Sequence, residues 1–435
     1  MLVSLGVLHR DEVRPGGSAS ANGFRTDLGA RLTYSPDDDL SIFGFGQTTI
    51  AHSTGYGRND RIGMGADFRV GSDWTLSAEA STGTTGPQAM AMIGHEPEPG
   101  KRSYVGVRVS PDVQDDVFVR NKTLNGIVMG TQQRLNEAVS VRAENTYGLF
   151  SDAGSASALY GVDFTHDARW TSWGLYETGR IFENASDFER HALSLGFGYK
   201  DAGIDWTNRG ELRFESSEDG IRGRTTALLQ SGLTAKTDDD WRVLAGFDSL
   251  LSRSDQSAIL DGDYVAASIG AAYRPVENDR LNALFRYTYF YDLPGPDQAT
   301  CRAPSLGPAQ RSHILSIDAN YDITPYLTLG AKYGVRVGEV SASRNSNDFV
   351  PSILHLGILR ADLAVFDDWG LLLEGRALYN PQSSIVDFGA LAAVSYDVTE
   401  QVRLGLGYNF GQFSDDLRNL NYDDHGVFFN MTAKF

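Results

Sequence analysis

The sequence predicts an all-β fold: a transmembrane, antiparallel, up-and-down β-barrel of about 24 strands, with a range of roughly 20–26. Three observations predict it. Stretches in which apolar and polar residues alternate recur about every 18 residues along the whole chain. The connections between these stretches alternate between short and long. The polar faces carry charged residues and glycine, as the wall of a wet lumen does, while the apolar faces are unbroken.

The alternation is clearest in the second half of the chain. In 326–338 one face is apolar, with Leu327, Leu329, Ala331, Tyr333, Val335 and Val337. The other face has Thr328, Gly330, Lys332, Gly334 and Arg336. A two-residue period belongs to a strand and not to a helix. A soluble sandwich would bury each apolar face against a second sheet, but so many strands without a domain boundary favour apolar faces turned to lipid.

The expected strands follow one another through the whole chain. In the first half they cover 2–9, 23–34, 40–51, 60–70, 73–82, 86–94, 102–110, 122–134, 138–148, 156–166, 170–181 and 187–200. In the second half they cover 202–215, 222–236, 240–252, 263–274, 280–291, 311–323, 326–338, 350–366, 369–380, 385–397, 401–411 and 426–435.

The stretch 86–94 is weak because Pro87 lies inside it. It is included because all the short turns fall on one side of the sheet only if a strand lies between residues 82 and 102. This predicts a turn at 95–101, an even number of strands, and both chain ends on the side of the short turns.

The two sides of the predicted barrel differ in the length of their connections. Short turns include 35–39, 70–73, 135–138, 236–240 and 397–401. Long connections include 10–22, 111–121, 291–311, 338–350 and 411–426. The stretch from Asp292 to Arg311 is rich in Pro and Gly and carries Cys301, so we expect it to fold over or into the mouth.

The last ten residues form a strand that ends on an aromatic residue. Its apolar face consists of Val427, Phe429, Met431, Ala433 and Phe435. It resembles the C-terminal strand of bacterial outer-membrane β-barrels, in which a terminal Phe and alternate upstream apolar residues are read by the barrel-assembly machinery. The resemblance implies short periplasmic turns and longer extracellular loops. It also implies an assembly signal formed by Phe429, Met431, Ala433 and Phe435.

Aromatic residues near the strand ends predict belts at two membrane interfaces. Trp74, Trp241 and Trp369 each open a strand after an acidic turn. The residues that close strands before such turns are Tyr34, Tyr273, Tyr321 and Tyr396. For the opposite belt we expect contributions from Tyr287, Tyr289, Phe290 and Tyr291.

Composition excludes several classes of protein. The net charge of -18 over 435 residues argues against a nucleic-acid partner, and the single cysteine excludes a disulfide framework. No run of about 18 apolar residues is present, so no transmembrane helix is expected. The start of the chain lacks the features of a signal peptide, and its first residues already have the pattern of a β-strand. We therefore expect residues 1–435 to be one barrel domain forming the C-terminal part of a longer precursor, with a mature chain as the alternative.

Catalytic and metal-binding patterns are weak. The eight histidines are scattered, His191 and His313 are expected to face lipid near the outer rim, and no HExxH, GxSxG or Walker pattern occurs. The acidic clusters 37–39, 238–240 and 423–424 could bind calcium, but solvated turns explain them better because they lack EF-hand spacing. The sequence therefore predicts no enzyme, no cofactor and no metal site.

The charged residues on the predicted inner faces are the candidate functional set. Those expected to line a pore are Arg209, Arg213, Glu215, Arg242, Arg286, Lys332, Arg336, Glu374, Arg376 and Arg403. Opposed rows of arginine and carboxylate could set an ion preference. The alternative is structural: ion pairs between strands that stiffen and hydrate a wide wall.

The stretch Tyr273–Leu281 running into Phe285–Tyr291 resembles the C-terminal barrels of large, uncharacterised proteobacterial surface proteins. The chain departs from TonB-dependent receptors, since no plug domain precedes its first strand, and from trimeric porins in having more strands. The resemblance implies location in the outer membrane. Its implied partners are outer-membrane lipid, the barrel-assembly machinery, and an upstream domain of the precursor or a periplasmic protein.

Three functions stay open at this point. The first is a wide, polar-lined channel that passes polar solutes or a polymer across the outer membrane. The second is a barrel that transports nothing and anchors or exports an upstream periplasmic or surface domain. The third is a soluble all-β adhesin. The long loops and charged inner faces favour passage, while the expectation of a longer precursor favours an anchor.

Overall fold

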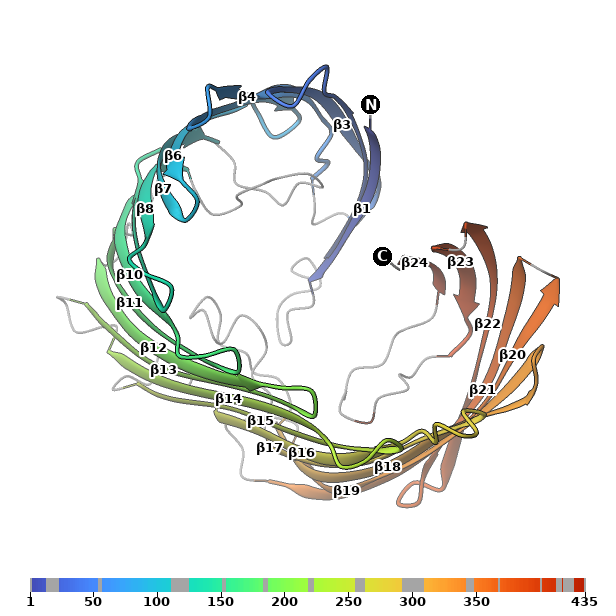
Figure 1. Ribbon diagram of the computed structural model, residues 1–435. Helices are drawn as coiled ribbons and strands as arrows, with labels where there is room; N and C mark the ends of the chain where they lie inside the picture. Colours follow the sequence, from blue (N-terminus) through green and yellow to red (C-terminus); the bar gives the residue numbers. More distant parts are fainter. Residues whose placement is uncertain are drawn as a thin grey trace.

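The computed structural model of the chain describes most of it. The described residues are 2–12, 23–53, 57–110, 125–150, 154–182, 187–217, 223–254, 263–291, 309–341, 348–366, 368–399, 401–411, 417 and 426–433. They form a single antiparallel sheet of 24 strands, in which each strand pairs with the next one along the chain. Figure 1 shows the sheet curving round until the first and last strands, β1 and β24, come back toward each other. The all-β, up-and-down fold and the number of strands are as predicted.

The strands of the first half are β1 (Leu2–Glu12), β2 (Gly23–Tyr34), β3 (Leu40–His52), β4 (Arg61–Val70), β5 (Trp74–Gly83), β6 (Gln88–Glu98), β7 (Lys101–Val109), β8 (Gly126–Arg134), β9 (Val139–Gly148), β10 (Gly154–Thr165), β11 (Trp170–Phe182) and β12 (Phe188–Lys200). Those of the second half are β13 (Ile204–Ser217), β14 (Arg224–Lys236), β15 (Trp241–Ser254), β16 (Asp263–Tyr273), β17 (Leu281–Tyr291), β18 (Ala309–Thr324), β19 (Leu327–Ser341), β20 (Val350–Phe366), β21 (Trp369–Asn380), β22 (Ile385–Thr399), β23 (Val402–Asn409) and β24 (Gly426–Ala433).

The weak strand after Pro87 exists as β6, and the turn predicted at 95–101 is present but shorter than predicted. β6 continues to Glu98, and the chain reverses within two residues before β7 begins at Lys101. Two features explain the longer strand. The backbone N–H of Glu96 donates a hydrogen bond of 2.7 Å to the carbonyl oxygen of Asp73. Gly100 adopts a φ of +85°, which suits a tight turn. The segment 292–308, with Cys301, lies outside the described residues.

The two faces of the sheet follow from register, because residues paired across antiparallel strands share a face. One face carries the buried polar residues, among them Asp27, Gln47 and Arg61. The opposite face carries the exposed apolar residues, such as Ile62 and Leu212. We call the first the inner face and the second the outer face of the curved sheet (Figure 1). The described residues contain no helix long and apolar enough to cross a membrane.

Four of the short turns share one device. Each has an aspartate whose Oδ1 atom accepts hydrogen bonds from the backbone N–H groups two and three residues later, at 2.7–3.0 Å. These residues are Asp37, Asp167, Asp201 and Asp238. The carboxylate stabilises the reversal by satisfying backbone donors that no strand partner reaches. The acidic clusters at 37–39 and 238–240 therefore shape turns.

Aromatic pairs mark the end of the sheet that carries the short turns. In four places the tryptophan that opens a strand lies directly opposite an aromatic ring on the next strand, with ring centroids 4.2–4.8 Å apart. The pairs are Trp74–His95, Trp170–Tyr199, Trp241–Tyr273 and Trp369–Tyr396, all on the outer face. The strands β18 and β22 continue past Tyr321 and Tyr396, so these two tyrosines do not close them.

A second set of aromatic residues lies nearer the end with the long connections. Tyrosine hydroxyls share hydrogen bonds of 2.7–2.9 Å with histidine Nδ1 atoms in three pairs, which are Tyr176–His191, Tyr287–His313 and Tyr333–His355. All of these residues are on the outer face, as are Tyr289 and Tyr291. The prediction was wrong for Phe290, which lies on the inner face and is only 3% exposed.

Candidate functional site

The inner wall carries the ten candidate residues. Register places Arg209, Arg213, Glu215, Arg242, Arg286, Lys332, Arg336, Glu374, Arg376 and Arg403 on the inner face of β13, β15, β17, β19, β21 and β23. Strand periodicity explains this placement, because each residue alternates with apolar neighbours that face outward. That these residues line a conducting pore stays a prediction.

Most of the charges on β13 are neutralised locally. Glu211 lies between two arginines, with Oε2 2.7 Å from Arg209 Nη2 and Oε1 2.7 Å from Arg213 Nη2. Its Oε2 also accepts a hydrogen bond of 3.0 Å from the hydroxyl of Ser194 on β12. The alternation of the sequence places Glu211 on the same face as Arg209 and Arg213, and the structure makes it the centre of this network.

Ion pairs between neighbouring strands continue the pattern. Glu215 Oε1 lies 2.7 Å from Arg190 Nη2 across β12 and β13. Arg403 binds Asp397 with two parallel contacts, Nε to Oδ1 at 2.6 Å and Nη2 to Oδ2 at 2.7 Å. Such two-pronged contacts fix both side chains. This geometry supports the structural interpretation of these residues, in which ion pairs stiffen the wall.

On β21 an ion pair forms between two residues of the same strand. The Arg376 guanidinium forms an ion pair with the carboxylate of Glu374, and both side chains are largely buried. Lys332 on β19 lies directly opposite Asp318 on β18. Arg336 donates hydrogen bonds of 3.2 Å to the carbonyl oxygen of Leu417 and to the Ser352 hydroxyl. Seven of the ten candidates thus form an ion pair or a hydrogen bond with a described residue. These are Arg209, Arg213, Glu215, Arg336, Glu374, Arg376 and Arg403.

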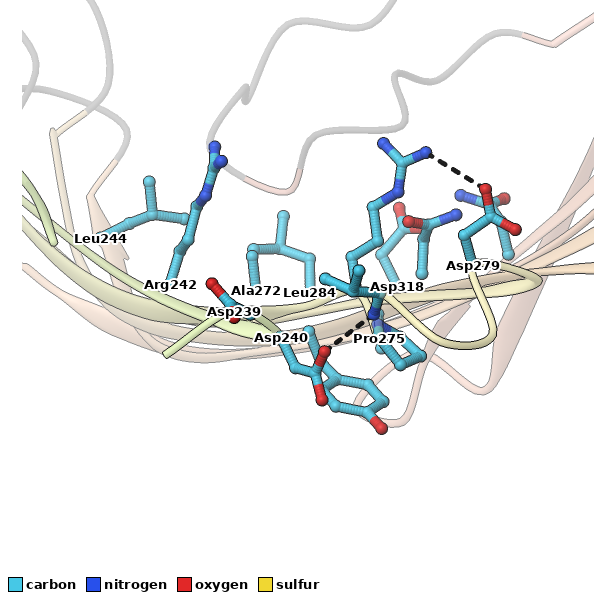
Figure 2. A pocket seen from close by; sticks show the side chains of 15 residues that line it. Asp239, Asp240, Arg242, Leu244, Ala272, Pro275, Asp279, Leu284 and Asp318 are labelled. Atoms are coloured by element: carbon cyan, nitrogen blue, oxygen red, sulfur yellow. Dashed lines mark hydrogen bonds and ion pairs between the residues drawn. The ribbon is translucent and has the colours of Figure 1, made fainter. Parts of the chain in front are cut away.

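Arg242 and Arg286 differ from the others. Within the described part of the chain, neither guanidinium forms a hydrogen bond or an ion pair. Arg242 lies in a recess of about 810 Å³ at the short-turn end of β15–β18, together with Asp318 and Asp279. Figure 2 shows Arg242 and Leu244 rising from the sheet at one side of the recess, with Asp279 and its turn at the other. Both side chains are exposed, so water and mobile ions can reach their charges.

The turn 274–280 forms one edge of this recess. Arg274 lies 3.8 Å from Asp279, and the backbone N–H of Val276 donates a hydrogen bond of 2.8 Å to Asp240 Oδ1 (Figure 2). The backbone N–H of Arg274 donates to the carbonyl of Asp240. Asp240 therefore ties this longer turn to the preceding one. The recess combines a free cation with carboxylates, a surface suited to small polar solutes.

A buried polar network lies at the other end of the inner wall. Asp27 is fully buried and accepts hydrogen bonds from Arg25 Nε at 2.8 Å and from the Thr49 hydroxyl at 2.7 Å. The Thr49 hydroxyl oxygen accepts from the backbone N–H of Asn59 at 2.8 Å, and Gln47 donates to the Asn59 carbonyl at 3.0 Å. The connection between β3 and β4 is thus held against the inner wall.

The remaining predicted sites are placed as follows. Phe429 and Met431 are exposed on the outer face of β24, opposite Leu406 and Leu404 of β23. Ala433 is the last residue of β24, and Phe435 lies outside the described residues. Their role as an assembly signal stays a prediction. Among the described residues, no three His, Cys, Asp or Glu side chains gather into a group that could hold a metal ion.

Comparison with known proteins finds similarity only among solved structures. No family model and no curated relative matches the sequence. One similar structure is the unliganded ferric citrate transporter FecA, 12% identical over 99% of this chain and 77% of that chain, with a TM-score of 0.45. Another is a mutant of the ferric enterobactin receptor PfeA from Pseudomonas aeruginosa, 11% identical over 100% of this chain and 80% of that chain, with a TM-score of 0.47.

A third similar structure is BauA, the ferric preacinetobactin receptor from Acinetobacter baumannii. It is 10% identical over 99% of this chain and 78% of that chain, with a TM-score of 0.46. At these identities, functional residues cannot be transferred between the chains. The function proposed below rests on the residues of this chain.

Proposed function

We propose that this chain is a β-barrel of the Gram-negative outer membrane, and that its lumen is a wide, polar-lined channel for polar solutes or a polymer. The observation that carries the proposal is the division of β13. Asp205, Arg209, Glu211, Arg213 and Glu215 point to the inner face, and Ile204, Trp206, Leu212 and Phe214 point to the outer face. A strand with this division suits lipid on one side and water on the other.

The two aromatic belts support a membrane position. On β11, Thr178 lies eight residues beyond Trp170 and pairs with His191. Eight residues span roughly 26 Å along a strand, or roughly 20 Å across a membrane for a strand tilted by about 40°. This is close to the roughly 25 Å apolar band of outer-membrane barrels. The belts are therefore spaced as two membrane interfaces would be.

The inner wall supports passage of polar solutes. Its ion pairs are satisfied within the wall, so a solute does not have to break them to pass. The free guanidinium groups of Arg242 and Arg286 provide weak sites for anionic groups. A barrel of about 24 strands is too wide for its own side chains to fill. The lumen therefore has room for water, an inserted segment or another chain, and the proposed channel is the part of it that water fills.

Proteoliposome swelling tests this function. Vesicles containing the refolded full chain are diluted into isotonic sugars of increasing size and into a charged oligosaccharide. We expect swelling rates that fall with solute size and that exceed those of protein-free vesicles for every sugar that enters. If the protein is folded and inserted, shown by a heat-dependent shift in gel mobility, and swelling equals the protein-free rate, the channel function is wrong.

A second function is favoured by the contact of Leu417 with the inner wall, which shows that the lumen receives part of the chain. An occupied lumen suits a barrel that anchors or exports an upstream domain of a longer precursor, as barrels of large bacterial surface proteins do. Folded and inserted protein that passes no solute would support this anchor function. The barrel-assembly machinery is the proposed partner in either case.

A further inference from the structure

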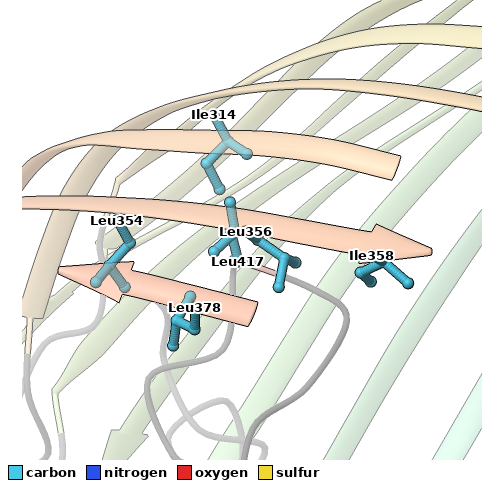
Figure 3. Packing of buried hydrophobic residues seen from close by; sticks show 6 residues of the cluster. All are labelled: Ile314, Leu354, Leu356, Ile358, Leu378 and Leu417. Atoms are coloured by element: carbon cyan, nitrogen blue, oxygen red, sulfur yellow. The ribbon is translucent and has the colours of Figure 1, made fainter. Parts of the chain in front are cut away.

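An apolar patch interrupts the polar inner wall between β18 and β21. It consists of Ile314 on β18, Leu354, Leu356 and Ile358 on β20, and Leu378 on β21, all buried (Figure 3). Register brings them together around β19, because Leu356 pairs with both Gly334 and Leu378. A lumen filled with water would leave this patch exposed at a cost in free energy, so something must cover it.

Leu417 covers the patch. This residue belongs to the connection between β23 and β24, far from the patch in sequence, yet its side chain packs among the five apolar residues (Figure 3). Leu356, at the centre of the patch, is 0% exposed. Gly334 makes room for the contact, because a Cβ atom at this position would lie 3.0 Å from Leu417 Cδ1.

The same site also binds the main chain. Arg336 is 2% exposed, and its Nη1 donates a hydrogen bond of 3.2 Å to the carbonyl oxygen of Leu417. Its Nη2 donates to the Ser352 hydroxyl at 3.2 Å, which orients the guanidinium. The wall therefore recognises a branched apolar side chain together with the carbonyl of the same residue. This combination selects a residue of a polypeptide over a free hydrocarbon.

We propose that this patch is a binding site for a leucine-like residue of a polypeptide in the lumen, and that Leu417 is its resident occupant. A peptide that offers an apolar side chain and a carbonyl in the same geometry competes with Leu417 for the site. The proposal rests on the lumen described under the proposed function, but the binding itself does not require that solutes pass.

Peptide binding to the detergent-solubilised full chain tests the proposal. The probe is a fluorescently labelled five-residue peptide with the sequence of residues 415–419, Asp-Asp-Leu-Arg-Asn. The control peptide has Ser in place of Leu. We expect Leu417→Ser, which vacates the site, to bind the leucine peptide at least about tenfold more tightly than the unmodified chain does, as fluorescence anisotropy measures. The serine peptide is expected not to bind either protein.

A second variant checks that binding occurs at this patch. Gly334→Leu combined with Leu417→Ser fills the site from the wall and is expected to abolish peptide binding. The heat-dependent gel shift confirms that each variant is folded. Equal binding of the leucine and serine peptides to Leu417→Ser, or binding unchanged by Gly334→Leu, would overturn the proposal.

The outcome is separable from that of the channel function. Leucine-selective binding without solute passage supports this site and contradicts the channel. Solute passage by folded Leu417→Ser without leucine-selective binding leaves the channel standing and shows that Leu417 is a fixed structural anchor, which contradicts the proposed site.

Discussion

The rings of Trp241 and Tyr273 lie directly opposite each other on the outer face of β15 and β16, with centroids 4.7 Å apart. Both residues adjoin short turns, and three similar pairs repeat the arrangement around the sheet. Amphipathic aromatic rings prefer the interface between hydrocarbon and headgroups. In the proposed outer-membrane barrel, these pairs mark where the barrel meets one surface of the membrane.

Lipid quenching tests the position of this belt. In a variant whose only tryptophan is Trp241, we expect lipids brominated near the headgroup to quench fluorescence more than lipids brominated near the chain ends, because the indole lies at the interface. The matched control keeps only Trp173, which is on the inner face of β11 and should be quenched little by either lipid. Equal quenching of the two variants would contradict the assignment of the faces.

Ion preference should depend on the unpaired arginines. Arg242→Gln combined with Arg286→Gln removes two inner-face cations that form no hydrogen bond or ion pair in the described part of the chain. We expect the cation-to-anion permeability ratio, obtained from reversal potentials in a salt gradient, to rise by roughly twofold. The lysine variants at the same positions keep the charge and should keep the ratio. An unchanged ratio in the glutamine variant would mean that these residues do not meet the permeating ions.

Substitution of Gly63 tests how tightly side chains pack on the inner wall. It lies opposite Phe45, whose ring covers it, and a Cβ atom there would lie 2.5 Å from Phe45 Cζ. Gly63→Ala should therefore destabilise the folded protein by about 1–3 kcal/mol through overpacking, measured by urea unfolding in lipid vesicles. Gly210→Ala is the control, since nothing lies within 4 Å of its Cβ position, and its effect should be within about 0.5 kcal/mol.

The connection between β3 and β4 contains Asp60, a carboxyl group whose pKa is lowered. A hydrogen bond from Arg58 lowers the pKa of Asp60 from its usual 3.8 to about 2, with further bonds from the Thr49 backbone and the Thr48 hydroxyl. Because the pKa falls on folding, these contacts stabilise the folded protein fully above pH 3.8. Their contribution is lost as the pH falls toward about 2.

The titration of Asp60 is measurable by NMR of protein labelled with ¹³C-aspartate, with Asp60→Asn to assign the signal. Arg58→Gln removes the largest cause of the shift, so the pKa of Asp60 should rise toward 3.8 in that variant. Arg58→Lys keeps a positive charge and should show a smaller rise. A usual pKa in the unmodified protein would mean that the Arg58–Asp60 contact does not form in solution.

The repeating pattern of the sequence predicted the strands because each one has to keep polar and apolar residues on opposite faces. The strand 350–366 coincides with β20, and even the weak strand at Pro87 was recovered from the requirement that short turns share one side. The end of β6 was missed, because the hydrogen bond from Glu96 on β6 to Asp73 in the turn before β5 joins residues distant in sequence and leaves no local signature.

The candidate site was only partly predictable. Periodicity placed Arg209 and Arg403 on the inner face, but which carboxylate each one binds depends on register between strands, which a single sequence does not reveal. The Leu417 contact was missed because it joins a connection to a distant strand. A signal for the patch did exist: Leu354, Leu356 and Ile358 are apolar on the face that the alternation predicts to be polar.

Single-channel recording tests the central claim most directly. Purified, refolded full chain is added to a planar lipid bilayer, and the current is followed at fixed voltage. A lumen lined by charged and polar side chains and open to water predicts large, stable conductance steps. Folded protein that inserts into the bilayer and never conducts would contradict an open channel, and protein that stays in water without detergent or lipid would contradict the membrane barrel itself.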